Sequence, residues 1–241
     1  MLAELQKIIY DLKAPDELVK SLIGVMKEVA LSIPSDWNDV WGCIKRVWGS
    51  KWNERAYLSR KANKIPDEDL IMSVLIQEVV ESDYSFVVHT VNPFTGDKDE
   101  VYAEVAPGLG ETLTAGYPGK ALSFTCRKGS RDLYLMSFPS KSVGLCGGGL
   151  IFRSDSNGED LAHYAGAGLY DSFVLPQPRR VTLDYTSDQL TWDAGFRTQL
   201  LLKISEIGAT VESIMQYPQD IEGAYSKGKY FIVQTRPQVG L

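Results

Sequence analysis

Cysteine is scarce in this sequence of 241 residues, and what is present excludes several classes of protein. The three cysteines, Cys43, Cys126 and Cys146, are far apart and odd in number. No CxxC pair and no zinc-ligand spacing occurs. A disulfide framework and a structural zinc site are therefore not expected. The protein is expected in a reducing compartment.

Long apolar runs and blocks of like charge are also missing. The longest apolar runs are far shorter than the ~20 residues that span a bilayer. The formal net charge is −6, so neither nucleic acid nor a membrane surface is expected as a partner. The N-terminal stretch "MLAELQKIIYDLK" has no signal-peptide architecture, and no transit peptide is expected in it. A bound anion would have to be held locally, by a few cations and backbone amides.

The composition that remains is that of a globular protein that begins with helices. Hydrophobic residues make up 44% and charged residues 23% of the chain, and the length allows one large or two small domains. Residues 1–62 show helical spacing, with Pro15 at a helix start and Trp37, Trp41 and Trp48 on one stripe. This spacing favours burial of the tryptophans; stacking on a sugar is the alternative.

Strands follow, and the fold class expected is α+β with mixed β-sheets and packed helices. Strands are predicted in "LIMSVLIQEVV", "YSFVVHTVNP", "DEVYAEVA", "ALSFTC" and "RRVTLDY". A late helix is predicted over 189–215 and a hairpin over 219–237. The domain division expected is a helical segment over 1–62 and a second domain over 63–241.

The closing hairpin carries polar side chains where a buried strand is expected. Since residues i and i+2 of a strand share a face, Ile232, Gln234 and Arg236 are predicted on one face, and Phe231, Val233 and Thr235 on the other. Asp220 and Glu222 alternate in the same way in the preceding strand. These carboxylates suit Mg²⁺, and Arg236 suits a phosphate. The alternative is a ladder of surface ion pairs.

Two further segments contain residues suited to a nucleotide. In "GLGETL", Gly108 and Gly110 allow close approach of a ligand, and Glu111 suits a metal or a hydroxyl; a plain connection is the alternative. In "IFRSDSNGEDLAHYAGAGLYDS", Arg153 leaves a strand beside hydroxyls and suits a phosphate oxygen. A capped surface turn, or an ion pair with a neighbouring carboxylate, is the alternative there.

The two histidines are not expected to be catalysts. Neither lies near a serine or cysteine nucleophile, and no HxxxH or HExxH spacing occurs. His89 is predicted to be a structural residue within a strand, and His163 is predicted at the surface.

Taken together, these motifs resemble a known family. "DIEG" and "GKYFIVQTRP" resemble the end of the nucleotide-binding domain of pyruvate phosphate dikinase and phosphoenolpyruvate synthase, which is an ATP-grasp fold. "VWGSKWNERA", "GLGETLTAGYPGKALSF" and "RSDSNGEDLAHYAGAGLYDS" are similar to the α-glucan water dikinases. The resemblance covers roughly residues 37–238 and implies an ATP-grasp-like nucleotide-binding domain, in its C-terminal portion, over 63–241.

The resemblance also implies a mechanism. ATP and Mg²⁺ bind between two lobes, the β-phosphate passes through a histidine on a separate phosphohistidine domain to an α-glucan, and the γ-phosphate passes to water. It implies that Glu222 binds the metal, with Gln234 as its polar partner, and that Arg236 and Arg153 contact phosphate. By the same resemblance, adenine is read by the backbone of Gln77, Glu78, Val79 and Val80, and Glu111 is the acid of the glycine loop.

Departures from the family pattern leave alternatives open. The phosphate-accepting histidine motif and the lysine-bearing lobe are missing, and "GLCGGGLIFRSD" has glycines where a basic pair is expected. The isolated chain is therefore not expected to complete a dikinase cycle. One alternative is an incomplete ATP-grasp remnant that binds a nucleotide or a partner, and another is a dikinase for pyruvate or a different small acceptor. The resemblance leaves plastid (chloroplast) and cytoplasm open as locations.

Overall fold

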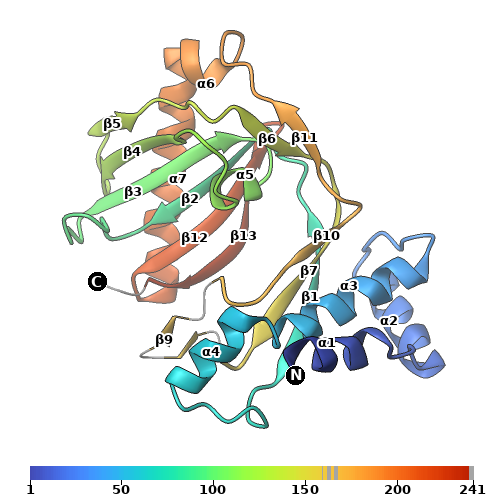
Figure 1. Cartoon of the computed structure of the whole chain (residues 1–241). Helices are drawn as coiled ribbons and strands as arrows, with labels where there is room; N and C mark the ends of the chain where they lie inside the picture. The colour runs from blue at the N-terminus through green and yellow to red at the C-terminus, as the bar shows by residue number, and fades with distance from the viewer. Residues whose placement is uncertain (159, 162–163, 166–167, 239–241) are drawn as a thin grey trace. The chain divides into compact units, whose positions relative to one another are not determined.

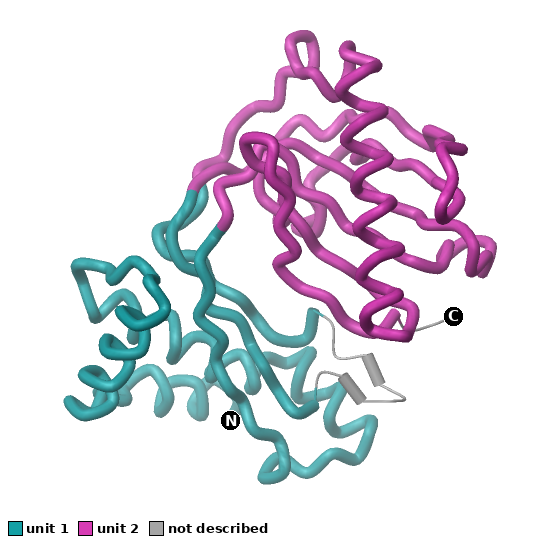
Figure 2. Tube along the Cα trace, turned by 180° about the vertical axis from the view of Figure 1, so that it is seen from behind, with its two compact units in different colours: residues 1–79, 148–178 teal, residues 80–147, 179–241 magenta. Residues whose placement is uncertain are grey.

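The computed structural model describes residues 1–158, 160–161, 164–165 and 168–238. It contains two compact units, unit 1 (residues 1–79 and 148–178) and unit 2 (residues 80–147 and 179–241), which Figure 2 colours separately. Both units combine helices with antiparallel sheets, so the predicted α+β class is confirmed. Within the described residues, no helix is long and apolar enough to cross a membrane.

Unit 1 joins the N-terminal helices to a small sheet. Its helices are α1 (Leu2–Tyr10), α2 (Asp16–Glu28), α3 (Trp37–Ser50) and α4 (Glu54–Ala62), and its strands are β1 (Met72–Val79), β7 (Gly149–Ser156), β8 (Asp160–Leu161), β9 (Tyr164–Ala165) and β10 (Phe173–Leu175). The helical prediction for residues 1–62 is thus confirmed. Unit 1 takes residues from both sides of the predicted boundary at 62 and 63, and the predicted domain division remains a prediction.

The core of unit 1 lies between α3 and the sheet of strand order β1-β7-β10. Trp41 is buried there; its ring packs edge-on against Trp48 at 5.4 Å, and its Nε1 donates to the Leu12 carbonyl oxygen at 2.9 Å. Because Trp37 and Trp48 are partly buried against the same cluster, the prediction that the tryptophans pack in the core is confirmed.

Unit 2 is built on a six-stranded antiparallel sheet of order β13-β12-β2-β3-β4-β5. The strands of unit 2 are β2 (Tyr84–His89), β3 (Glu100–Pro107), β4 (Leu122–Arg127), β5 (Leu133–Ser137), β6 (Val143–Cys146), β11 (Arg179–Thr182), β12 (Gln219–Ser226) and β13 (Lys229–Pro237). Its helices are α5 (Glu111–Thr114), α6 (Gln189–Trp192) and α7 (Ala194–Met215). Strands β6 and β11 pair separately.

Helix α7 covers one face of the six-stranded sheet, behind it in Figure 1. Leu200, Leu201 and Ile204 of the helix are buried against Phe86 and Val88 of β2. The predicted late helix is observed in two pieces: the side chains of Asp188 and Asp193 accept hydrogen bonds from the first turns of α6 and α7, as N-cap residues do. The opposite face of the sheet points away from α7.

The closing hairpin is confirmed, but one part of its predicted pattern is wrong. Glu222 lies opposite Gln234, whereas Gly223 lies opposite Ile232, so the register shifts at Val233. An extra residue of this kind interrupts the strict alternation of side chains. Phe231, which lies opposite Ala224, therefore shares the face of Gln234 and Arg236, and Ile232 does not.

Candidate functional site

The face of the unit 2 sheet that points away from α7 collects polar side chains from several strands. Residues that lie opposite one another in neighbouring strands point to the same face, so the register arranges these side chains in rows. The first row is Gln234, Glu222, Val87, Glu104 and Ser123, and the second row is Arg236, Asp220, His89, Tyr102 and Thr125. We call these ten residues the polar face. Four of the predicted site residues lie on it.

Asp220 and Arg236 form an ion pair across the hairpin. Nε and Nη2 of Arg236 donate to the same oxygen, Oδ2 of Asp220, at 2.9 and 2.7 Å. The side chains are 14% exposed for Asp220 and 31% exposed for Arg236. Charge-assisted bonds of this kind hold a guanidinium in a fixed orientation. The ion-pair alternative is therefore realised in this one cross-strand pair.

The neighbouring cross-strand pair joins the carboxylate of Glu222 to the amide of Gln234. Oε1 of Gln234 is buried and accepts no hydrogen bond from any residue that the structure describes. A buried acceptor without a partner is costly, by about 1–3 kcal/mol. A carboxylate and an amide oxygen side by side are ligands that suit Mg²⁺.

The side-chain oxygens of Glu222 and Gln234 suit a metal ion that a substrate also binds. In the described part of the chain, no three His, Cys, Asp or Glu side chains are grouped so as to hold a metal ion. Mg²⁺ commonly binds through one or two protein oxygens together with phosphates and water, and Glu222 and Gln234 fit that pattern. Asp220, predicted as a further metal ligand, has one oxygen bound by Arg236.

His89 lies in β2 directly opposite Asp220. Its Nδ1 is 3.8 Å from Oδ1 of Asp220 and, among the described residues, accepts or donates no hydrogen bond. Its ring stacks on Tyr102 at 6.2 Å between centroids. The prediction placed His89 in a strand, and that is confirmed; its place beside Asp220 depends on the pairing of β2 with β12, which the sequence does not show.

Tyr102 and Glu104 were not predicted as site residues. The Tyr102 hydroxyl donates to Oε1 of Glu104 at 2.7 Å. Burial raises the pKa of Tyr102 to about 12, and the bond to Glu104 adds to that rise, so the phenol remains a donor at neutral pH. The sequence signal was their spacing in "VYAEVA", where two polar residues alternate with Val101 and Val105, which are buried against α7.

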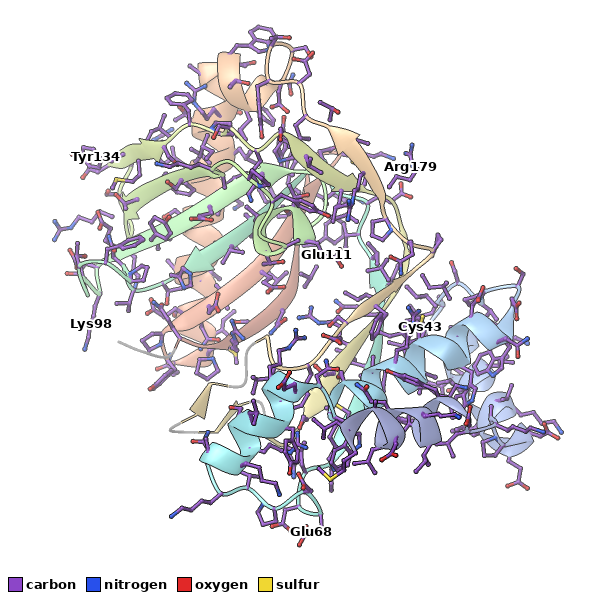
Figure 3. The ribbon with its side chains drawn as sticks, viewed as in Figure 1. Cys43, Glu68, Lys98, Glu111, Tyr134 and Arg179 are labelled. Carbon is purple, nitrogen blue, oxygen red and sulfur yellow. The ribbon has the colours of Figure 1, made fainter. Side chains whose placement is uncertain are left out.

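The glycine loop is packed against β6. Gly108 has φ +82°, and a Cβ there would come within 2.3 Å of the Leu145 carbonyl oxygen, which also accepts from the Leu109 amide at 2.8 Å. This close approach explains Gly108 without a ligand. Glu111 is the first residue of α5, which contacts β2 and β3 (Figure 3). Burial raises the pKa of the half-buried Glu111 carboxyl above its usual value.

The remaining predicted residues form a second set, in unit 1. Gln77, Glu78 and Val79 end strand β1 and pair with β7, the strand that carries Arg153. Arg153 lies opposite Leu75, so Arg153 and Gln77 share one face of that sheet. Val80 is the first residue of unit 2, which places the predicted adenine-reading segment where the chain passes from one unit to the other. His163 lies outside the described residues.

Comparison with known proteins confirms the resemblance predicted from the sequence. Residues 3–118 match the family described as "Pyruvate phosphate dikinase, AMP/ATP-binding domain". The chain is 48% identical to the chloroplastic alpha-glucan water dikinase of Solanum tuberosum, over 99% of the chain and 17% of the relative. It is 49% identical to alpha-glucan water dikinase 1 of Arabidopsis thaliana, over 99% of the chain and 18% of the relative. Phosphoenolpyruvate synthase of Pyrococcus furiosus is 27% identical over 83% of the chain.

The chain matches only a part of each relative. The chain spans only about a fifth of the length of these relatives, from 17% to 22%. The match therefore concerns one part of each relative, and the activity of the whole relative does not transfer with it.

Proposed function

Because the chain is a relative of the α-glucan water dikinases along nearly its whole length, we propose that it is the ATP-binding part of a glucan water dikinase. In the proposed reaction, the β-phosphate of ATP passes through a histidine on a separate domain to an α-glucan, and the γ-phosphate passes to water. The observation that carries the proposal is the hairpin of unit 2, where Asp220 holds Arg236 beside Glu222 and Gln234.

In this proposal, the hairpin neutralises the charge of the nucleotide phosphates. Phosphoryl transfer needs positioning and charge neutralisation rather than a covalent group in the nucleotide-binding lobe. Arg236 contacts a phosphate oxygen, and Asp220 keeps its guanidinium oriented. Glu222 and the Oε1 atom of Gln234 would hold Mg²⁺, which supplies further positive charge when bound. The buried Oε1 without a described partner supports this assignment.

Unit 1, taken by itself, carries further candidate contacts to a nucleotide. The backbone of Gln77 to Val80 would bind adenine, and Arg153 would contact phosphate. The register of β1 with β7, by which Arg153 and Gln77 share one face of the unit 1 sheet, supports the assignment. Within unit 2, Gly110 and Glu111 of the glycine loop are further candidates for contacts to a nucleotide.

The partners follow from the proposed reaction. They are a domain that carries the phosphate-accepting histidine, and an α-glucan. A plastid is the proposed location, since three of the relatives are named as chloroplastic. A glucan is favoured over pyruvate because identity to the glucan dikinases, at 48%, exceeds the 27% to phosphoenolpyruvate synthase.

A positional label tests this function. The chain is combined with the histidine-bearing domain of the Solanum tuberosum relative, Mg²⁺, an α-glucan, pyruvate, and ATP labelled either at the β- or at the γ-phosphate. The expected result is β-label in the glucan and γ-label in inorganic phosphate. Label in pyruvate instead of glucan would favour a dikinase with a small acceptor. Saturable ATP binding with no transfer of label would favour a nucleotide-binding module without catalysis.

A further inference from the structure

Glu104 is a carboxylate on the polar face that the proposed nucleotide contacts leave unused. It lies in the first row, separated from Glu222 only by Val87 of the intervening strand β2. Strands in a sheet are about 4.8 Å apart, so two strand spacings place the backbones of Glu104 and Glu222 about 10 Å apart. Both side chains point away from α7, because Ala103 and Val105 on either side of Glu104 are buried against that helix.

The surroundings of Glu104 are those of a carboxylate that is held in place but not neutralised. Its one described hydrogen bond is the 2.7 Å contact from the Tyr102 hydroxyl, and it is half-buried. No lysine or arginine within the described ranges forms an ion pair with it, in contrast to Asp220 in the second row. Tyr102 is itself fixed by packing, since Phe94 lies edge-on to its ring at 5.1 Å and His89 stacks on it.

An oriented carboxylate without an ion-pair partner has the chemistry of a general base toward water. A general base needs to lie within hydrogen-bond reach of the proton that it removes, and contributes about 10²–10⁴-fold to the rate. The gap of about 10 Å between the backbones of Glu104 and Glu222 is bridged only by the short side chain of Val87. Glu104 therefore lies about two strand spacings from Glu222, the carboxylate assigned to the metal, on the same face of the sheet.

We propose that Glu104 is the proton acceptor for the water that receives the γ-phosphate, and that Tyr102 is its positioning residue. This inference rests on the proposed function. The water oxygen forms a bond to the γ-phosphorus, and the bond from that phosphorus to the bridging oxygen breaks. The electron pair of the broken bond stays on the bridging oxygen, which remains with the β-phosphate. The proton of the water passes to an oxygen of Glu104.

The test compares the variant Glu104→Gln with a variant in which a carboxylate on the other side of the sheet is changed in the same way. Glu206 lies on α7 with its side chain 66% exposed, and Glu206→Gln is the control. Each protein is titrated with Mg-ATP by calorimetry, its unfolding midpoint is measured, and release of γ-phosphate is followed in a single turnover with the histidine-bearing domain present. Tyr102→Phe is measured in the same way.

The expected result separates binding from chemistry. Glu104→Gln is expected to bind Mg-ATP within about twofold of the unchanged chain and to release γ-phosphate about 10²–10⁴-fold more slowly. Tyr102→Phe is expected to slow the single-turnover release of γ-phosphate about 5–10-fold, as loss of one positioning hydrogen bond does, with affinity for Mg-ATP unchanged. Glu206→Gln is expected to match the unchanged chain.

Three outcomes would overturn the inference. Release of γ-phosphate by Glu104→Gln within threefold of the unchanged rate would exclude a proton-acceptor role and leave the proposed function intact. Loss of Mg-ATP binding in a well-folded Glu104→Gln variant would make Glu104 a binding residue. Absence of both binding and phosphate release in the unchanged chain would refute the proposed function, and the inference with it.

Discussion

The ion pair between Asp220 and Arg236 allows a quantitative test of the hairpin. Two N–H groups of Arg236 share one oxygen of Asp220, and the side chains are only 31% and 14% exposed. Exposed pairs contribute about 0.2–1 kcal/mol, whereas breaking a buried pair costs about 3–5 kcal/mol. The intermediate burial here predicts a coupling energy of about 1–2 kcal/mol after allowance for solvent screening.

The assay is a double-mutant cycle by urea denaturation. Asp220→Asn, Arg236→Gln and the double variant are compared with the unchanged chain, all with equal m-values as the check on two-state unfolding. The double variant is expected to lose about 1–2 kcal/mol less than the sum of the two single changes. Additivity within about 0.3 kcal/mol would refute the conclusion that this pair holds the guanidinium in place.

Two further predictions concern packing and pH. Gly223→Ala is expected to destabilise unit 2 by about 1–3 kcal/mol, because the new Cβ would lie 2.2 Å from the Phe86 ring. Gly42→Ala, whose Cβ meets no atom within 4 Å, is the control and is expected to gain up to about 1 kcal/mol in helix α3. Glu111→Gln is expected to stabilise the fold at pH 7: burial raises the folded-state pKa of Glu111, so its carboxylate opposes folding above that pKa. That gain is expected to vanish below the unfolded pKa, and urea melts at pH 7 and pH 4 check it; equal gains at both would contradict the sign.

Local sequence patterns predicted the helices and the closing hairpin, and these are the features in which the structure agrees with the sequence. Helical spacing identified the helices of residues 1–62 and the long helix that ends at Met215. Alternation and the turn "SKGK" identified the closing hairpin, and the cross-strand ion pair in it was the alternative to a binding face. These features depend on neighbours within a few residues along the chain, which is the range over which propensity and period act.

Features that depend on distant strands could not be predicted in the same way. The register shift at Val233 exchanged the faces of Phe231 and Ile232, and nothing in the local sequence marks such a bulge. Glu104 joins the polar face only because β2 lies between β3 and β12. The strand order, with β12 and β13 returning beside β2 from the far end of the chain, brings Ile221 of β12 into the core beneath α7 and is marked by no local motif.

Nucleotide binding by the closing hairpin is tested by a calorimetric titration of Mg-ATP into the chain, beside Glu222→Gln. The control is Glu206→Gln, an exposed carboxylate on α7, and the folding of every variant is checked by its unfolding midpoint. We expect saturable binding by the unchanged chain and by the control, and a loss of at least tenfold in affinity for Glu222→Gln. Equal affinity in all three proteins would contradict the claim that the closing hairpin binds the nucleotide phosphates.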